Sequence, residues 1–164
     1  MLMLLRHLLS IVLLPVMMAG VVPRWLLRGF RDVDTRWLPG PLGVAGRALG
    51  VALLVAGLAL FAWCVTLFAR VGQGTLAPWD PTTRLVAVGP YRYVRNPMIT
   101  SVATMLAGQA LLAGSRVLGA WFGTFVVLNH AFFLAVEEPG LEERFGEPYR
   151  EYRRRVPRWI PRLR

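Results

Sequence analysis

An unbroken apolar run over residues 48–69, bounded by Arg47 and Arg70, is the feature that most constrains the fold. A helix rises about 1.5 Å per residue, so about 20 apolar residues cross the roughly 30 Å of hydrocarbon in a bilayer. Gly50 and Gly57 within the run would allow another helix to approach closely. The composition agrees, because 55% hydrophobic residues and a mean hydropathy of +0.50 exceed what an ordinary soluble domain requires. The run therefore predicts a membrane-spanning helix.

A second apolar run, over residues 8–22, has more than one interpretation. It follows Arg6 and contains Pro15, so it resembles a secretory signal peptide as much as a span. The residues after it offer a poor small-residue cleavage pattern, which favours a retained span. A re-entrant or interfacial segment is the third interpretation.

Two further runs, over residues 98–113 and 117–136, are separated only by the tripeptide GSR. So short a connection predicts a tight helical hairpin. The first of these runs is short for a span and contains hydroxyl side chains and Gln109, so we expect protein to shield it. Trp121 in the other run suits a membrane interface.

Together the runs predict an all-α integral membrane helical bundle, with about four transmembrane helices and a C-terminal interfacial helical tail. Residues 1–79 would form an N-terminal transmembrane hairpin with its connecting loop. Residues 80–164 would add a second loop, a helical hairpin and the tail. The two parts would make one integrated membrane domain.

All nineteen basic residues are arginines, and the formal net charge is +10. The arginines lie beside apolar segments, which indicates contact with lipid headgroups rather than with nucleic acid. With four spans, thirteen arginines would share the side of both termini and six would lie opposite. This imbalance predicts cytoplasmic termini. One observation conflicts with that orientation, because it places the five arginines of the loop 23–47 outside. The single Cys64 and the lack of a zinc-like Cys/His spacing predict no internal disulfide and no structural metal.

The segment GPYRYVRNPM, residues 89–98, places chain breakers, tyrosines and arginines directly before the third run. Asn96 before Pro97 predicts a helix start, because asparagine caps free N–H groups and proline fits the first helical position. A carboxylate could bind this helix start with help from Arg95 or Arg84. Plain capping, with the arginines on lipid phosphates, is the alternative interpretation.

Polar side chains also mark the end of the fourth run. Asn129 and Glu137 lie on one helical row and His130 and Glu138 on the next, which predicts a polar stripe facing inward. Carboxylates at a helix C-terminus oppose the macrodipole, so we expect a cation beside Glu137 and Glu138. That cation would be a tail arginine or a positively charged ligand. His130 is interpreted as either a packing residue or a catalytic base.

The tail over residues 140–161 alternates acidic and basic residues. Gly146 and Pro148 are expected to break it into two short helices, and the proline pairs at 156–157 and 160–161 to end it in extended conformation. We interpret it as an interfacial lid. A basic anchor on anionic lipid is the alternative.

Three blocks occur in a fixed order around the helical hairpin: GPYRYVRNPM at 89–98, EEPGL at 137–141 and FGEPYREYRRRVPRWIP at 145–161. In these blocks the chain resembles the membrane-embedded methyltransferases that include isoprenylcysteine carboxyl methyltransferase and the phospholipid N-methyltransferases. The resemblance covers residues 80–162. It implies an enzyme of the bacterial cell membrane that binds S-adenosylmethionine between a cofactor-binding loop, the hairpin and the tail.

The resemblance maps one set of positions onto cofactor contacts, to which the helix-start argument adds Arg95. The set is Arg84, Leu85, Val86, Tyr91, Arg95, Asn96, Pro97, Met98 and Glu137. Ile99 follows the block where many relatives have a tyrosine, so an aromatic contact is lost or supplied by Tyr93. Phe133 stands where the eukaryotic isoprenylcysteine enzymes have an arginine, which argues against a prenylcysteine carboxylate as acceptor.

The first hypothesis is therefore an S-adenosylmethionine-dependent methyltransferase. Its acceptor would be a lipid-like or otherwise hydrophobic small molecule, methylated at the cytoplasmic membrane face. An amine or hydroxyl acceptor would have to lose a proton, for which Glu138 or His130 is the candidate base. The second hypothesis is a noncatalytic scaffold that binds anionic membrane lipids through its arginine-rich tail. A small transporter is a third, and the residues indicate neither the acceptor nor the oligomeric state.

Overall fold

A computed structural model describes residues 12–34, 39–72 and 82–161, and within these ranges the chain forms helices and no strand. The elements, in chain order, are η1 (Val12–Val21), α2 (Val22–Gly29), α3 (Gly40–Leu67), η2 (Phe68–Gly72), η3 (Gly89–Arg92), α4 (Pro97–Ala113), α5 (Arg116–Phe132), η4 (Phe133–Glu137), α6 (Glu138–Phe145) and α7 (Glu147–Arg155). Here η denotes a π or 3₁₀ segment. The predicted all-α class is confirmed.

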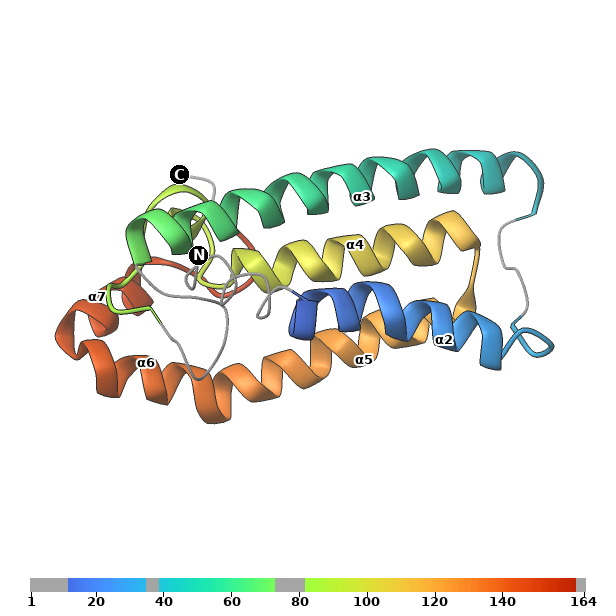
Figure 1. Cartoon of the computed structure of the whole chain (residues 1–164). Coiled ribbons are helices and arrows are strands. Elements are labelled where there is room, and N and C mark those ends of the chain that lie inside the picture. Colours follow the sequence, from blue (N-terminus) through green and yellow to red (C-terminus); the bar gives the residue numbers. More distant parts are fainter. Residues whose placement is uncertain (1–11, 35–38, 73–81, 162–164) are drawn as a thin grey trace.

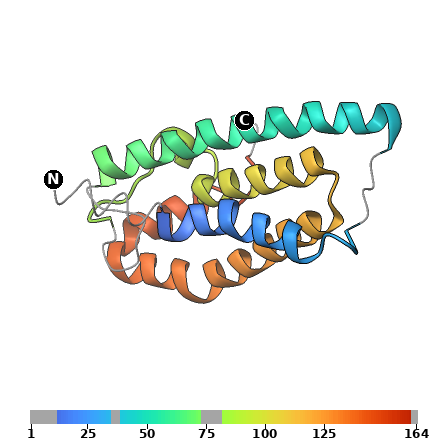
Figure 2. The same cartoon turned by 45° about the vertical axis from the view of Figure 1, so that its right-hand side comes forward.

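The long helices run alongside one another (Figures 1 and 2). α4 lies between α3 on one side and α2 with α5 on the other. At one end of this bundle α6 continues the line of α5, and α7 turns back beside the segment that precedes α4. Parts of the chain that are far apart in sequence are therefore collected at that end.

α3 packs against α4 through a row of small residues. Its buried residues are Gly43, Gly50, Gly57 and Cys64, each seven positions from the next, so they lie on one helical face. A Cβ atom built on Gly50 would lie 2.8 Å from the carbonyl oxygen of Gly108, and one on Gly57 would lie 2.9 Å from that of Ser101. The predicted close approach at Gly50 and Gly57 is confirmed, and the two backbones are almost in contact.

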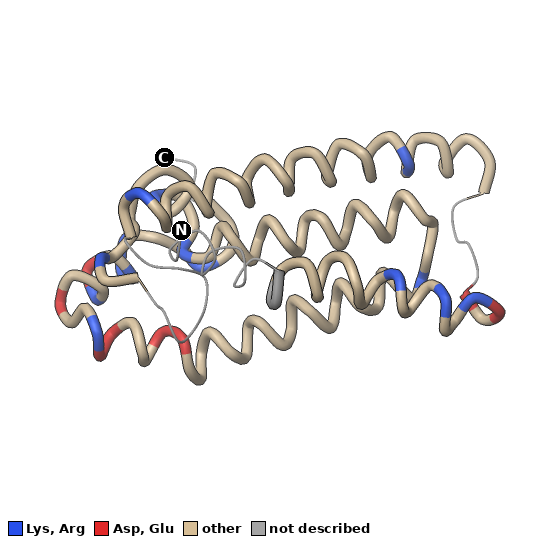
Figure 3. Tube along the Cα trace, viewed as in Figure 1, with Lys and Arg blue, Asp and Glu red and all other residues tan. Residues whose placement is uncertain are grey.

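Two helical segments, Gly40–Gly72 and Arg116–Phe145, are long and apolar enough to cross a membrane. In the most apolar 18-residue stretch of each segment, only 11% and 17% of the residues are buried in the protein. A core helix of a soluble domain would be largely buried. Figure 3 shows the charged residues gathered at the two ends of the bundle, with uncharged stretches between them. Apolar shafts that face outward fit a lipid environment. Two of the four predicted spans thus have the required length and composition, and the other two stay predictions.

α4 is the helix most enclosed by protein, as the sequence led us to expect. Its buried residues are Pro97, Ser101, Val102, Ala103, Met105, Leu106, Gly108 and Ala110. Gln109 donates from Nε2 to the carbonyl oxygen of Ala19 at 2.6 Å, and Trp121 of α5 donates from Nε1 to that of Met18 at 3.2 Å. Both carbonyls belong to η1, so these polar side chains fasten the first helical segment to the hairpin.

The connection between α4 and α5 is the predicted tight hairpin. Gly114 ends α4 with a φ of 61°, a left-handed conformation that glycine adopts without strain. Ser115 Oγ accepts from the backbone N–H of Leu118, and it donates to Asp34 Oδ2 at 2.6 Å. Asp34 thereby joins the segment after α2 to the start of α5, a contact that the sequence did not indicate.

Two local predictions were wrong. Asn96 is the residue before α4, and Pro97 is the first in the helix as predicted, but the Asn96 side chain makes no capping hydrogen bond. Its carbonyl instead accepts from the Thr100 hydroxyl at 2.9 Å. The helix of the fourth run also does not end at Glu137 and Glu138. It continues through η4 into α6 as far as Phe145, and the following proline falls where the π hydrogen-bond pattern of η4 changes to the α pattern of α6.

Replacing Gly57 by alanine tests the contact between α3 and α4. The added methyl group would meet both the Met105 side chain and the Ser101 carbonyl, so we expect a loss of about 1–3 kcal/mol in the free energy of unfolding. Gly119→Ala in α5 is the matched control, because nothing lies within 4 Å of its position. Thermal unfolding in detergent measures both. Equal stability of the two variants would contradict close packing of α3 on α4.

Candidate functional site

The segment before α4 is anchored by Tyr91, which is 6% exposed and packs in a cluster with Cys64 and Val86. Gly89 begins the 3₁₀ turn η3 with a φ of 58°, which redirects the chain and lets Tyr91 enter this cluster. The hydroxyl of Tyr152, from α7, donates to the carbonyl oxygen of Tyr91 at 2.7 Å. The segment and the tail are therefore held together.

The tail consists of α6, α7 and an extended end, as predicted. Gly146 separates the two helices with a φ of 59°, and Val156 after α7 is in extended conformation. The backbone N–H of Arg95 donates to the carbonyl oxygen of Pro157 at 2.9 Å. This places the extended end directly beside the residue that precedes Asn96.

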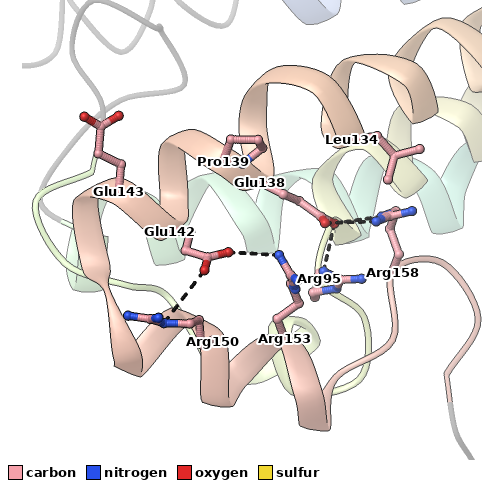
Figure 4. A pocket seen from close by; sticks show the side chains of 9 residues that line it. All are labelled: Arg95, Leu134, Glu138, Pro139, Glu142, Glu143, Arg150, Arg153 and Arg158. Atoms are coloured by element: carbon pink, nitrogen blue, oxygen red, sulfur yellow. Dashed lines mark hydrogen bonds and ion pairs between the residues drawn. The ribbon is translucent and has the colours of Figure 1, made fainter.

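A carboxylate with two arginines occupies the junction of these elements (Figure 4). Glu138 is 7% exposed, and both its oxygens accept from Arg158: Nε donates to Oε1 at 2.8 Å and Nη2 to Oε2 at 2.9 Å. Arg95 approaches from the other side, with Nη1 2.8 Å from Oε1. Such a bidentate pair is strong and geometrically specific. It joins the loop, the end of the long helix and the tail.

Arg95 retains unused hydrogen-bonding capacity. Its Nη1 is paired with Glu138 Oε1, whereas its buried Nε has no hydrogen-bond partner in the part of the chain that the structure describes. Buried N–H groups nearly always have a partner in native proteins. An oxygen of a bound anion would satisfy the Nε–H.

The ion cluster forms the inner wall of a cavity of about 610 Å³. The lining residues are Arg95, Leu134, Glu138, Pro139, Glu142, Glu143, Arg150, Arg153 and Arg158. Glu142 pairs with Arg153 at 3.0 Å and lies 3.8 Å from Arg150 (Figure 4). The cavity is thus polar and strongly charged except where Leu134 and Pro139 face it.

Two tyrosines stand next to the cluster as neutral groups. Burial raises the pKa of Tyr91 well above its usual value, and burial followed by the charge of Glu138 raises that of Tyr149. The carboxylate of Glu137, which is partly buried, adds to both shifts.

The predicted cofactor positions fall into two groups. Arg95 lines the cavity. The charge of Glu137 contributes to the raised pKa of Tyr91. Pro97 and Val86 are buried, Met98 packs against the Tyr91 cluster, Leu85 and Asn96 are partly buried, and Arg84 is exposed. Apart from Arg95, none of the nine lines the cavity. Their role in binding stays a prediction.

The predicted inward polar stripe is wrong in one of its two rows. In the row of Asn129 and Glu137, Asn129 is partly buried and donates to the Phe125 carbonyl. In the other row only Glu138 is buried. His130 is exposed, and its Nδ1 accepts from Trp159 Nε1 at 3.1 Å. The π turn η4 lies between His130 and Glu138. Residues after this turn therefore no longer share a helical face with the residues that precede it at the usual spacing.

The predicted cation beside the glutamates is a tail arginine, Arg158, together with Arg95. The sequence did not single out Arg158, Arg153 or Glu142. A signal was present, since the tail repeats acid and base at helical spacing, but sequence spacing cannot tell which arginine turns back toward Glu138. Among the described residues, no three His, Cys, Asp or Glu side chains gather as they would to hold a metal ion.

Outward-facing apolar shafts and a charged site at one end define a helical protein of the membrane type. Residues 45–148, well over half of the chain, match the family described as phospholipid methyltransferase. The chain therefore belongs to the phospholipid methyltransferase family, and the predicted superfamily is confirmed. The match extends from α3 to the start of α7 and includes Arg95, Glu137 and Glu138.

Two bacterial relatives are similar to the chain. The nickel-cobalt-cadmium resistance protein NccN of Alcaligenes xylosoxydans xylosoxydans is 26% identical over 138 residues, which cover 84% of this chain. The chain spans only 58% of the length of NccN. An uncharacterized protein of Haemophilus influenzae is 35% identical over 65 residues, 38% of this chain and 100% of that protein. No solved structure matches the chain significantly.

Removing the carboxylate of Glu138 should destabilise the protein strongly. Glu138→Ala leaves Arg95 and Arg158 without their shared partner in a largely buried place, which costs about 3–5 kcal/mol in comparable sites. Glu143→Ala, on the exposed rim of the same cavity, should change little. Thermal unfolding in detergent compares them. If both variants unfold at the same temperature as the wild type, the cluster does not hold the tail in place.

Proposed function

We propose that the protein transfers a methyl group from S-adenosylmethionine to a lipid-like or membrane-partitioning acceptor at the cytoplasmic face of the membrane. The family to which the chain belongs supports methyl transfer. The single structural observation that supports it most is Arg95, whose buried Nε lacks a hydrogen-bond partner beside a cavity of about 610 Å³.

The residues present suit the parts of S-adenosylmethionine. The guanidinium of Arg95, with its unpartnered Nε–H, would hold its carboxylate, because a guanidinium binds carboxylates with charge-assisted hydrogen bonds. The carboxylate of Glu137 and the ring of Tyr91 are the groups proposed for the sulfonium. The packed cluster of Val86, Tyr91 and Met98 would have to open to receive the adenine, since none of the three lines the cavity.

When bound, S-adenosylmethionine supplies an electrophilic methyl group: the carbon–sulfur bond breaks with its electron pair on sulfur as the acceptor's lone pair forms the new bond. The work of the chain is then to hold the acceptor atom in line and to keep water out. An amine or hydroxyl acceptor must also lose a proton. Glu138 and His130 remain the candidate bases, although both Glu138 oxygens are occupied by Arg158 in this conformation.

The acceptor is proposed to arrive from the bilayer. Leu134 lines the cavity and is also 51% exposed on the outward face of the long helix. A molecule dissolved in lipid would therefore approach the charged cavity from the apolar surface at Leu134. This supports an acceptor with a hydrophobic body and a reactive polar end.

The alternative of a lipid-binding scaffold is less well supported. Among the described residues, five of its eight tail arginines are paired with glutamates of the same chain: Arg150 and Arg154 with Glu147, Arg153 with Glu142, Arg155 with Glu151, and Arg158 with Glu138. These internal pairs compete with lipid phosphates for the same guanidinium groups. We therefore favour the enzyme.

Calorimetric titration of S-adenosylmethionine into the purified protein in detergent tests the proposal. Saturable binding is expected, weakened at least about tenfold in Arg95→Ala, since a hydrogen bond to a charged group contributes about 1.5–3 kcal/mol. Arg92→Ala is the matched control, because Arg92 lies in the same segment, is exposed and does not line the cavity. Absence of binding by a folded wild-type protein would remove the proposal.

Glu137→Ala is expected to weaken the same binding while the protein stays folded, because Glu137 is the carboxylate proposed for the sulfonium. Asn96→Ala, at the residue before α4, is also expected to weaken the binding of S-adenosylmethionine. Incubation with radiolabelled S-adenosylmethionine and a total bacterial lipid extract then asks which lipid takes up label. Label in no lipid, with binding intact, would argue against a lipid-like acceptor.

A further inference from the structure

Three consecutive residues after α7 bind three different elements. We name residues 156–159 the tail strap. The Pro157 carbonyl accepts from the Arg95 N–H of the loop, Arg158 pairs with Glu138 of α6, and Trp159 Nε1 donates to His130 Nδ1 of α5. The indole also packs on Phe133, with ring centroids 5.6 Å apart. The strap thus crosses the cavity wall from the loop to the long helix.

The three attachments differ in strength. The Arg158 pair is bidentate and charged, and its side chains are only 18% and 9% exposed. The Trp159 bond joins two neutral groups at an exposed place, and neutral hydrogen bonds are roughly half as strong as charged ones. Beyond Trp159, Ile160 is 80% exposed. The strap is therefore weakest at its Trp159 end.

That end lies next to the apolar wall of the cavity. Trp159 covers Phe133, which is 1% exposed, and the next residue, Leu134, both lines the cavity and faces outward. Trp159 does not itself line the cavity, so lifting it would extend the cavity past Leu134 toward the side that faces lipid. It would also carry Arg158 away from Glu138, leaving Glu138 paired with Arg95 alone.

We infer that the tail strap is the closure through which the hydrophobic acceptor reaches the cavity, and that Trp159 is a positioning residue. Trp159 acts through its neighbour Arg158, whose guanidinium it keeps on Glu138. The inference rests on the proposed function for the identity of the entering molecule. The opening itself is a property of the fold and can be measured without substrate.

Hydrogen exchange of the Arg95 amide, read at single-residue resolution on the full chain in detergent, reports the opening. This amide donates to Pro157, whereas the amides of Tyr93 and Val94 donate to Pro90 within the loop and serve as internal references. Trp159→Phe keeps a ring over Phe133 but removes the donor, and His130→Leu removes the acceptor. Each should speed exchange at Arg95 about two- to tenfold, the range for one lost neutral hydrogen bond, with the references unchanged.

His130→Asn supplies the conservative rescue, because its amide oxygen can accept from the indole in place of Nδ1, and exchange at Arg95 should return toward the wild-type rate. Trp25→Phe, at an exposed tryptophan of α2 remote from the strap, is the control and should change nothing. Unchanged exchange at Arg95 in both Trp159→Phe and His130→Leu, with thermal stability retained, would overturn the inference. Faster exchange at all three amides would also overturn it, since the whole loop would then be loosened.

The failure of the proposed function is a separate outcome. If S-adenosylmethionine does not bind to the wild type while the exchange pattern is as expected, the enzyme proposal falls and the strap remains. If binding is intact, labelling of the lipid extract decides the entry route. Trp159→Phe should then shift the half-saturating lipid concentration at least about twofold, matching the lower limit for the lost bond, and leave that for S-adenosylmethionine unchanged. Equal shifts in both would contradict entry beneath the strap.

Discussion

The arrangement of the site depends on one interaction, the pairing of Glu138 with Arg158 and Arg95. These residues come from the end of the long helix, from the tail and from the segment before α4, and their pairing joins all three. Leaving any one of these buried charges without its partners would be costly, so the three elements stay together. The interaction also fixes the position of the cavity, since all three residues line it.

The helical shafts provide a rigid base for this junction. Glycines spaced by seven residues bring the backbone of α3 against α4, and the tight turn at Gly114 returns the chain as α5. The close contact uses small residues rather than bulky apolar ones, which suits a surrounding in which lipid satisfies large apolar side chains as well as protein does. Leucines, valines and tryptophans are accordingly left on the outside.

A methyl transfer enzyme of the membrane needs a charged site within reach of lipid, and this bundle offers a way to combine the two. Most of the charges at the site are paired within the protein, so they can lie next to an apolar surface. Leu134 belongs to both the cavity and the outer face. The tail strap packs on Phe133 beside Leu134, and its weakest attachment lies on the side from which a hydrophobic acceptor would come.

The sequence by itself determined the helical class, the apolar shafts, the hairpin at GSR, the close approach at Gly50 and Gly57, and the family, because these depend on local composition, spacing and motif order. It also led to Arg95 and Glu138 as residues of interest. Only the tertiary structure decided that the long helix continues past Glu138, that His130 faces outward, and that Arg158 rather than another tail arginine is the principal partner. The reason is physical: a π turn changes which residues share a face, and an ion pair between distant segments depends on where the folded chain brings them, which residue spacing does not encode.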